Sequence, residues 1–244
     1  MIVYGRNPVR EALRGRRAHA LAGIWASGGA AREPWLAGCE VKTVAAEELE
    51  RLSGSTAHQG ICAEVGPYPY AGVAEILTLA SPLIVALDQV QDPQNLGSIC
   101  RTAECAGAAG VVIPERRAAE VTPSVCKASA GAVEHLRVAR VRNLADFLAE
   151  ARRAGCWCYG ASAEDGAGGE RPLRYDEPDY RGGGVVLVLG SEGNGLRPRV
   201  AGACDQLVAL PLLGKIGSLG VSAAASAILY EILQQRAGML DKGS

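Results

Sequence analysis

The chain has 244 residues, 48% of them hydrophobic, which is enough for one or two domains with a substantial core. Its formal net charge of −1 excludes a global field that would recruit nucleic acid, so a polyanion site must be a local patch. The eight cysteines include no C-x-x-C pair, which argues against a metal site and favours core thiols in a reducing cytosol. Without a signal peptide or a membrane-length apolar run, we expect a cytoplasmic protein with no membrane partner.

The first part of the chain predicts a small α/β unit of about 65 residues. Asn7 is expected to cap a helix that has Pro8 in its first turn. Strand-like and helical segments then alternate at 21–25, 41–44, 46–52 and 61–65. Since 66–73, GPYPYAGV, is rich in Pro and Gly, we expect a domain at 1–68, a linker at 69–80 and a second domain at 81–244.

The second part predicts a parallel sheet covered on both faces, because short apolar strands alternate with helices. The expected strands are 83–87, 110–113, 136–141, 156–161, 185–189 and 206–210, and the expected helices are 95–106, 122–130, 143–154 and 221–235. Asn143 and Asp146 stand at the N-cap and N3 positions of their helix, as in a capping box. Residues 162–184 show no period and form a long loop of open function.

Three segments combine a strand end, a loop of small polar residues and a helix start. They are LDQVQDPQNLGSICRTAECAG at 87–107, LGSEGNGL at 189–196 and LPLLGKIGSLGVSAAASAILYE at 210–231. Because ligands bind outside the carboxyl ends of parallel strands, we expect all three to form one site. The loops lack the Lys-Ser/Thr of a triphosphate site and the G-x-G-x-x-G of a dinucleotide site, so a nicotinamide oxidoreductase has little support.

In this order, the three segments resemble the motifs of the SpoU (TrmH) family of RNA ribose 2′-O-methyltransferases. YGRNPVREAL at 4–13 and HQGI at 58–61 resemble the N-terminal RNA-binding extension of bacterial 23S rRNA guanosine 2′-O-methyltransferases. The resemblance implies an L30e-like N-terminal domain, a SPOUT-type α/β domain with a trefoil knot, and a homodimer packed through that second domain. It also implies S-adenosylmethionine-dependent methylation of an RNA ribose, with a guanosine of 23S rRNA as the expected target.

The resemblance also implies a cofactor pocket around the second and third motifs, where glycine lets the backbone approach a ligand closely. The predicted cofactor-binding residues are Leu189, Gly190, Gly193, Leu210, Leu212, Ile216, Ser218 and Leu219. For the glycines, a tight turn without a ligand is the alternative.

Arg101 has the central catalytic role by the resemblance. A guanidinium keeps its proton at any physiological pH, so we expect Arg101 to bind a substrate phosphate and stabilise alkoxide charge, while a phosphate oxygen or water accepts the proton. Asn95 either orients the substrate or caps the helix. Glu192 either pairs with Arg101 of one or the other subunit, contacts RNA, or neutralises a helix N-terminus. Ser218 either contacts substrate or cofactor, or caps the last helix.

One residue departs from the family pattern. The third motif usually reads Ser-Leu-Asn-Val-Ser, whereas residues 218–222 read Ser-Leu-Gly-Val-Ser, so Gly220 offers no side-chain amide. This keeps open a second hypothesis, a non-catalytic RNA-binding protein of ribosome assembly on a methyltransferase scaffold. A tRNA ribose methyltransferase is a further alternative.

Basic residues near the N-terminus are the candidates for holding RNA. Arg6, Arg10, Arg14 and Arg17 recur at helical spacing and form either a stripe for phosphates or an ordinary solvated face. His58 and Gln59 precede a strand and either form a turn or contact RNA. A second basic group falls in the catalytic domain and comprises Arg116, Arg117, Lys127, Arg137, Arg140 and Arg142.

Overall fold

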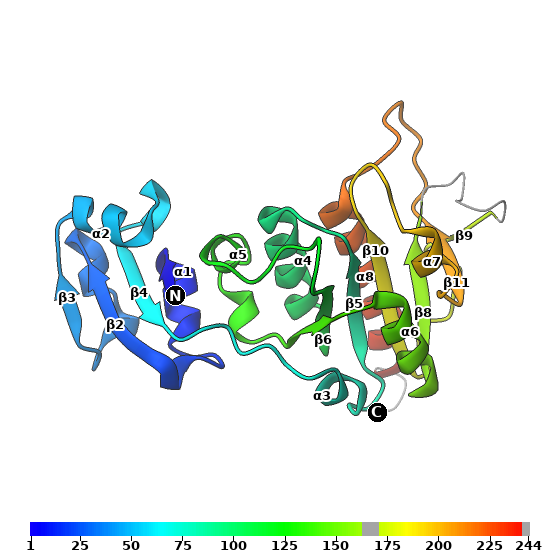
Figure 1. Ribbon diagram of the computed structural model, residues 1–244, viewed down its shortest axis with the longest axis horizontal. Coiled ribbons are helices and arrows are strands. Elements are labelled where there is room, and N and C mark those ends of the chain that lie inside the picture. Colours follow the sequence, from blue (N-terminus) through cyan, green and yellow to red (C-terminus); the bar gives the residue numbers. More distant parts are fainter. Residues whose placement is uncertain (163–170, 241–244) are drawn as a thin grey trace. The chain divides into compact units, whose positions relative to one another are not determined.

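The computed structural model describes residues 1–162 and 171–240, with side chains as far as residue 237, and it divides into two compact units (Figure 1). The first unit contains Met1–Pro69 and Glu120–His135, and the second contains the rest of the described chain. The expected division into 1–68, a linker and 81–244 therefore differs in one major respect. A segment from the middle of the second domain, residues 120–135, packs in the first unit.

The first unit is built on a four-stranded sheet in the order β1-β4-β2-β3. Both β1 (Ile2–Tyr4) and β2 (Leu21–Ala26) run antiparallel to β4 (Ile61–Val65), and β3 (Val41–Thr43) runs parallel to β2. The strands expected in this unit are confirmed. The sequence did not predict β1, because its three residues are too few to show a period of two. The buried side chains that join the sheet to its helices include Val3, Val9, Ile24, Leu49 and Ile61.

Short helices surround this sheet. They are α1 (Arg6–Ala12) and α2 (Ala46–Ser53), with single 3-10 turns at Ala18–Ala20, Gly28–Arg32, Pro34–Leu36 and Thr56–His58. Gly5, with φ of 95°, stands at the N-cap of α1, so Asn7 lies inside the helix and the expectation that it is the cap is wrong. Because α1 ends at Ala12, the predicted helical stripe that continues to Arg17 does not exist.

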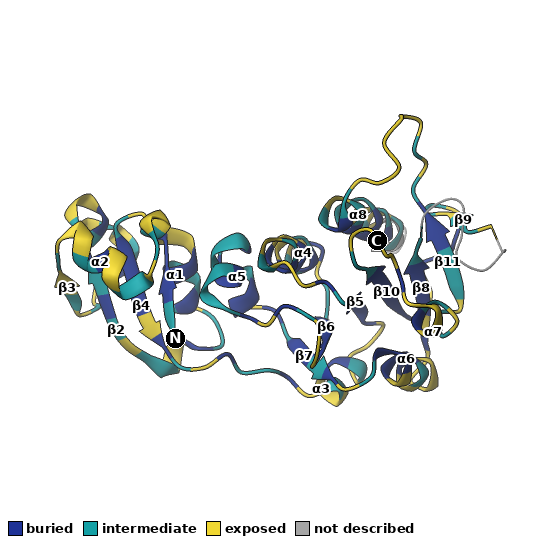
Figure 2. Cartoon of the chain, turned by 45° about the horizontal axis from the view of Figure 1, so that its top comes forward, coloured by how far each residue is buried: buried dark blue, intermediate teal, exposed yellow. Residues whose placement is uncertain are grey.

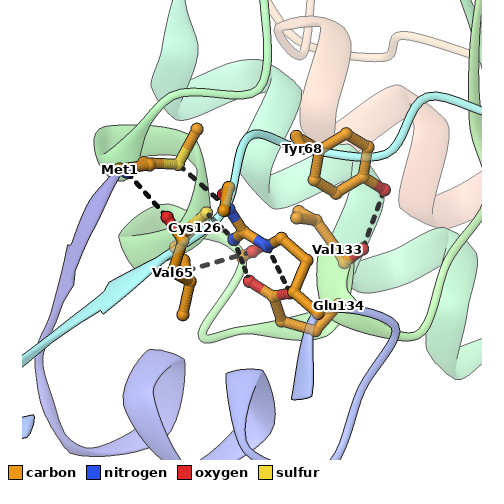
Figure 3. Close-up of polar contacts among 9 residues, drawn as sticks. Met1, Val65, Tyr68, Cys126, Val133 and Glu134 are labelled. Atoms are coloured by element: carbon orange, nitrogen blue, oxygen red, sulfur yellow. Dashed lines mark hydrogen bonds and ion pairs between the residues drawn. The ribbon is translucent and has the colours of Figure 1, made fainter. Parts of the chain in front are cut away.

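The 120–135 segment completes the core of the first unit. It holds α5 (Pro123–Ala128), which is capped by the Thr122 hydroxyl and packs against α1 and β1, and a 3-10 turn at Ala132–Glu134. Glu134, which is labelled in Figure 3, forms a buried ion pair with Arg17, in which Arg17 Nε donates to Glu134 Oε2 at 2.9 Å. Nearby, the Tyr68 hydroxyl donates to the Val133 carbonyl at 2.9 Å (Figure 3).

The second unit contains a seven-stranded sheet in the order β7-β6-β5-β10-β8-β11-β9, and all of its recorded pairings are parallel, as predicted. The strands are β5 (Leu83–Asp88), β6 (Gly110–Pro114), β7 (Val138–Val141), β8 (Cys156–Ala161), β9 (Leu173–Arg174), β10 (Gly184–Gly190) and β11 (Gln206–Ala209). The long loop expected at 162–184 contains the edge strand β9, and its residues 163–170 lie outside the described chain.

Helices cover both faces of this sheet (Figure 2). One face carries α3 (Val73–Leu77), α6 (Leu144–Arg153) and α7 (Pro198–Ala201), whose apolar side chains join one core with the strands. The other carries α4 (Pro93–Cys105) and α8 (Val221–Leu240), which lie side by side with Thr102 Oγ1 and Ser226 Oγ 3.0 Å apart. Because helices cover both faces of the sheet, every residue of β5 is buried. The apolar run 83–87 predicted such a buried strand.

Part of the expected linker is ordered structure of the second unit. Residues 73–77 form α3, whose Ile76 is fully buried, and Ala71 bridges to Ala139 beside the sheet. The trefoil knot implied by the resemblance stays a prediction. No helix in the described ranges 1–162 and 171–240 is long and apolar enough to cross a bilayer.

Candidate active site

A cavity of about 850 Å³ lies at the carboxyl end of the second unit's sheet. Its walls come from the end of β8, the loop that follows β10, the segment 210–220 after β11, and the first turn of α8. In Figure 1 the segment 210–220, in orange, projects beyond the strand ends. The second and third glycine-rich segments therefore meet at one cavity, at the sheet edge where the sequence predicted a site. Its volume is in the range of small-molecule sites.

The loop after β10 is a tight turn that glycine alone can form. Ser191 and Gly195 exchange two backbone hydrogen bonds, of 3.1 and 2.9 Å, and Gly193 has a φ of 82°. A Cβ on Gly190 would lie 2.1 Å from the carbonyl carbon of Gly195, so any larger residue forces the turn apart. This turn is also a wall of the cavity. The glycines therefore form a tight turn, and cofactor binding by this turn stays a prediction.

Most of the predicted cofactor-binding residues line this cavity: Leu189, Gly190, Gly193, Leu210, Leu212, Ser218 and Leu219. Ile216 does not, since its side chain is 76% exposed and it is absent from the cavity wall. Sequence reasoning missed Ala161 and Ser162, which close the cavity from the end of β8. They could be found only by knowing that β8 lies beside β10, a neighbour relation that no local pattern encodes.

A smaller cavity of about 310 Å³ is lined by residues of both the first and the second motif. Asn95 lines it together with residues 89–92, Glu192 and Asn194, and Glu192 also lines the larger cavity. Asp92 caps α4, because its Oδ1 accepts from the Gln94 backbone N–H at 2.9 Å. The alternative role of Asn95 as N-cap is therefore wrong, and its amide makes no hydrogen bond with the described residues.

Arg101 lies on α4 with an exposed side chain and lines neither cavity. Within the described chain it forms no ion pair. The structure thus brings Asn95, Glu192 and Ser218 to the two cavities of a single chain, and Arg101 stands apart from them.

Gly220, the unusual residue of the third motif, adopts a backbone conformation that asparagine can also adopt. Gly220 has a φ of 78°, in the left-handed region that glycine and asparagine adopt most readily. Its carbonyl accepts from Ala224 N–H at 3.1 Å, so Gly220 and not Ser218 has the N-cap position of α8. A Cβ there would meet nothing closer than Glu192 Oε1, at 3.5 Å. The chain therefore lacks only the motif's side-chain amide beside Glu192.

Asp88 and Arg197 form an ion pair that sequence reasoning missed. Asp88, fully buried at the end of β5, accepts from Arg197 Nε at 2.8 Å and from its backbone N–H at 2.9 Å. A buried carboxylate requires such pairing, and here the pairing ties the chain that follows the 190–195 turn to the neighbouring strand. The signal in the sequence was a carboxylate directly after the apolar run 83–87.

The predicted RNA-binding arginines of the first unit differ in their surroundings. Arg17 is 1% exposed and paired with Glu134, so its predicted RNA contact is wrong. Arg6 and Arg10 pair with Glu33 and Glu11, at 3.0 and 2.7 Å, on the surface. Arg14 is exposed past the end of α1.

The His58-Gln59-Gly60 segment is a turn, as one of its two interpretations predicted. His58 Nδ1 accepts from Gly60 N–H at 3.0 Å, and Gln59 has a φ of 54°. Gln59 Oε1 accepts from Arg6 N–H at 3.1 Å, which fixes the turn against the start of α1. RNA contact by His58 or Gln59 stays a prediction. No group of three or more metal-ligating side chains occurs among the residues that the structure describes.

Comparison with known proteins agrees with this geometry. Residues 82–230 match the model of the SpoU rRNA methylase family, and residues 2–71 match that of RNA 2′-O ribose methyltransferase substrate binding. Two similar proteins are named as TrmH family tRNA/rRNA methyltransferases. One, from Staphylococcus haemolyticus, is 36% identical over 97% of this chain and 96% of its own length. The other, YacO of Bacillus subtilis, is 38% identical over 96% and 95%.

A solved structure is similar over most of its length. The SpoU methyltransferase AviRb from Streptomyces viridochromogenes, in complex with the cofactor AdoMet, superposes with a TM-score of 0.79 at 26% identity, over 97% of this chain and 90% of that one. With a glycine-walled cavity at the carboxyl edge of a parallel sheet, an attached substrate-binding unit and relatives matched over nearly their full lengths, the chain belongs to the SpoU rRNA methylase family.

Proposed function

We propose that this protein transfers a methyl group from S-adenosylmethionine to the 2′-hydroxyl of a guanosine ribose in 23S rRNA, and that it acts as a homodimer. The observation that carries the proposal is the pair of adjoining cavities that share Glu192. The larger is suited to the methyl donor and the smaller to the ribose that receives the methyl group.

The residues of the larger cavity fit S-adenosylmethionine. Leu189, Leu210 and Leu219 offer apolar surface for the adenosine, and the backbone of the 190–195 turn offers N–H and C=O groups for its polar edge. Glu192 is the one charged side chain among the described residues of the wall, which suits a ligand that carries positive charge. When bound, S-adenosylmethionine supplies an electrophilic methyl group attached to a sulfonium.

The smaller cavity supplies polar groups for the acceptor ribose. Asn95, whose amide has no partner in the described chain, and Glu192 can both hydrogen-bond hydroxyl groups. Positioning of two reactants in line lowers a barrier by about 7–11 kcal/mol in ideal cases. In this proposal the residues of the smaller cavity contribute to catalysis mainly by orienting the ribose.

A second copy of the chain supplies Arg101 in this proposal. The side chain is exposed on α4, makes no ion pair in the described chain and lines neither cavity of its own subunit. Its permanent charge suits a substrate phosphate and the developing alkoxide. Tyr230, 51% exposed on the neighbouring α8, adds apolar surface for dimer contact.

Arg101→Ala tests this role. We expect methyl transfer to ribosomal RNA to fall at least ~100-fold, as when a transition-state charge partner is removed, while calorimetry shows unchanged S-adenosylmethionine binding. Arg153→Ala, an exposed arginine on α6, is the matched control and should keep full activity. Activity of Arg101→Ala equal to that of the control would remove Arg101 from the mechanism.

Mixed dimers test the contribution in trans. Arg101→Ala and Glu192→Ala homodimers should each be inactive. After subunit exchange, activity should return, because one site of the mixed dimer then combines an intact Arg101 with an intact Glu192. If the mixture stays as inactive as its components, the two residues act from the same chain.

Gly220 is the observation that favours the second candidate, a non-catalytic RNA-binding protein. Calorimetry with S-adenosylmethionine separates the two candidates, since absence of binding supports the non-catalytic one. If the donor binds, mapping of ribose methylation in ribosomal and transfer RNA from cells with and without the gene distinguishes a 23S rRNA target from a tRNA target.

A further inference from the structure

Lys127 belongs to the first unit, although the sequence placed it in the catalytic domain. It lies on α5, inside the range matched by the methylase model, yet α5 packs against α1 and β1 of the first unit. The substrate-binding unit therefore includes a basic residue from outside the 2–71 range of its own family model.

The ammonium group of Lys127 lies over the backbone at Gly5. A Cβ added to Gly5 would stand 2.5 Å from Lys127 Nζ and 3.0 Å from Gln59 Oε1. The lysine and the glutamine thus converge on one backbone point from two different elements. A side chain at position 5 would displace the ends of both side chains, so glycine permits their close approach, and its φ of 95° also favours glycine.

Both side chains keep hydrogen-bond donors without acceptors. Within the described chain, Lys127 makes no ion pair or hydrogen bond, although it is half-buried and this burial lowers the pKa of its ammonium. Gln59 Oε1 is engaged by the Arg6 backbone N–H, whereas its amide NH₂ has no acceptor among the described residues. A cation partly withdrawn from water without a counter-charge carries a free-energy cost, which an incoming anion offsets.

We propose that Lys127 and the side-chain amide of Gln59 form a phosphate-binding site for the RNA backbone, with Gly5 as the residue that makes room for it. The site rests on the RNA substrate of the proposed function. A backbone phosphate offers a negative charge and several acceptor oxygens, which match an ammonium beside an amide NH₂. Exposed Gln59, on the tip of its turn, leaves the site open to a large ligand.

Lys127→Met and Lys42→Met are the test and its matched control. Lys42 lies on β3 of the same unit, exposed over the Trp25 ring, so both changes remove one lysine charge from one unit. Binding to purified ribosomal RNA is measured at several salt concentrations, together with thermal unfolding. Lys127→Met should weaken binding and reduce the slope of log affinity against log salt by about 1, whereas Lys42→Met should change neither.

Gln59→Glu is a second, independent variant. A glutamate keeps the oxygen that accepts from Arg6 N–H and replaces the amide NH₂ by a second carboxylate oxygen, which pairs with Lys127 and repels phosphate. We expect a larger loss of RNA affinity than in Lys127→Met. Wild-type affinity and salt slope in both Lys127→Met and Gln59→Glu would overturn the site.

The outcomes separate this site from the proposed function. If wild-type protein methylates RNA and both variants bind RNA normally, the site is wrong and the function stands. If wild-type protein transfers no methyl group but binds RNA in a Lys127-dependent manner, the site stands and the function fails. If wild-type protein binds neither ribosomal RNA nor transfer RNA, both are wrong.

Discussion

At the residue scale, Arg17 shows how a charge in a basic stretch can belong to the core. Its guanidinium binds Glu134, the Gly66 carbonyl at 3.1 Å and Met1 Sδ at 3.2 Å, and it stacks on Tyr68 at 5.6 Å. Removal of one partner of a buried ion pair leaves the other charge buried and unpaired. Arg17→Met should therefore lower the free energy of unfolding by about 3–5 kcal/mol. Chemical denaturation measures this loss.

Two comparisons make the Arg17 experiment decisive. Arg14→Met, at an exposed position nearby, should change stability little, and Arg17→Met combined with Glu134→Leu should recover much of the loss because no charge is left unpaired. Equal stability of Arg17→Met and Arg14→Met would show that Arg17 has no structural role.

At the element scale, the 190–195 turn couples backbone geometry to ligand binding. Gly190→Ala places a Cβ 2.1 Å from Gly195, so the turn must open and the cavity wall with it. We expect Gly190→Ala to weaken S-adenosylmethionine binding at least ~10-fold by calorimetry. Gly214→Ala is the control, because a Cβ there meets nothing within 4 Å and its φ is not in the left-handed region. Equal binding by both variants would mean that the turn does not shape the binding site.

The elements of the second unit were largely predictable from sequence, and those of the first were less so. Runs such as 83–87 and 185–189 are apolar on both faces, which identifies buried parallel strands without tertiary information. The place of the two cavities was predicted from the three motifs, because loops that follow parallel strands lie at the same edge of the sheet. The roles of Ser162 and Lys127 could not be predicted this way, because they depend on a neighbouring strand and on a packing partner distant in sequence.

At the scale of the whole molecule, the polypeptide passes between the two units three times, near residues 69, 119 and 135. Deletion of residues 1–69 would therefore expose Val125, Cys126 and Val133 and leave Glu134 without Arg17. We expect such a truncated protein to aggregate. A truncated protein in which a glycine-serine linker also replaces 120–135 should stay monodisperse and bind S-adenosylmethionine. A monodisperse, cooperatively unfolding product of the simple deletion would contradict this expectation, as measured by size-exclusion chromatography and thermal unfolding.

The return of 120–135 to the first unit has a consequence for biosynthesis. Residues 1–69 leave the ribosome first, whereas Glu134 follows only after the 64 residues 70–133, at a rate of ~5–20 residues per second. For about 3–13 s the nascent N-terminal segment holds an arginine that lacks its carboxylate and a sheet that lacks one of its helices. The domain translated first is thus completed only after translation of its successor is well under way.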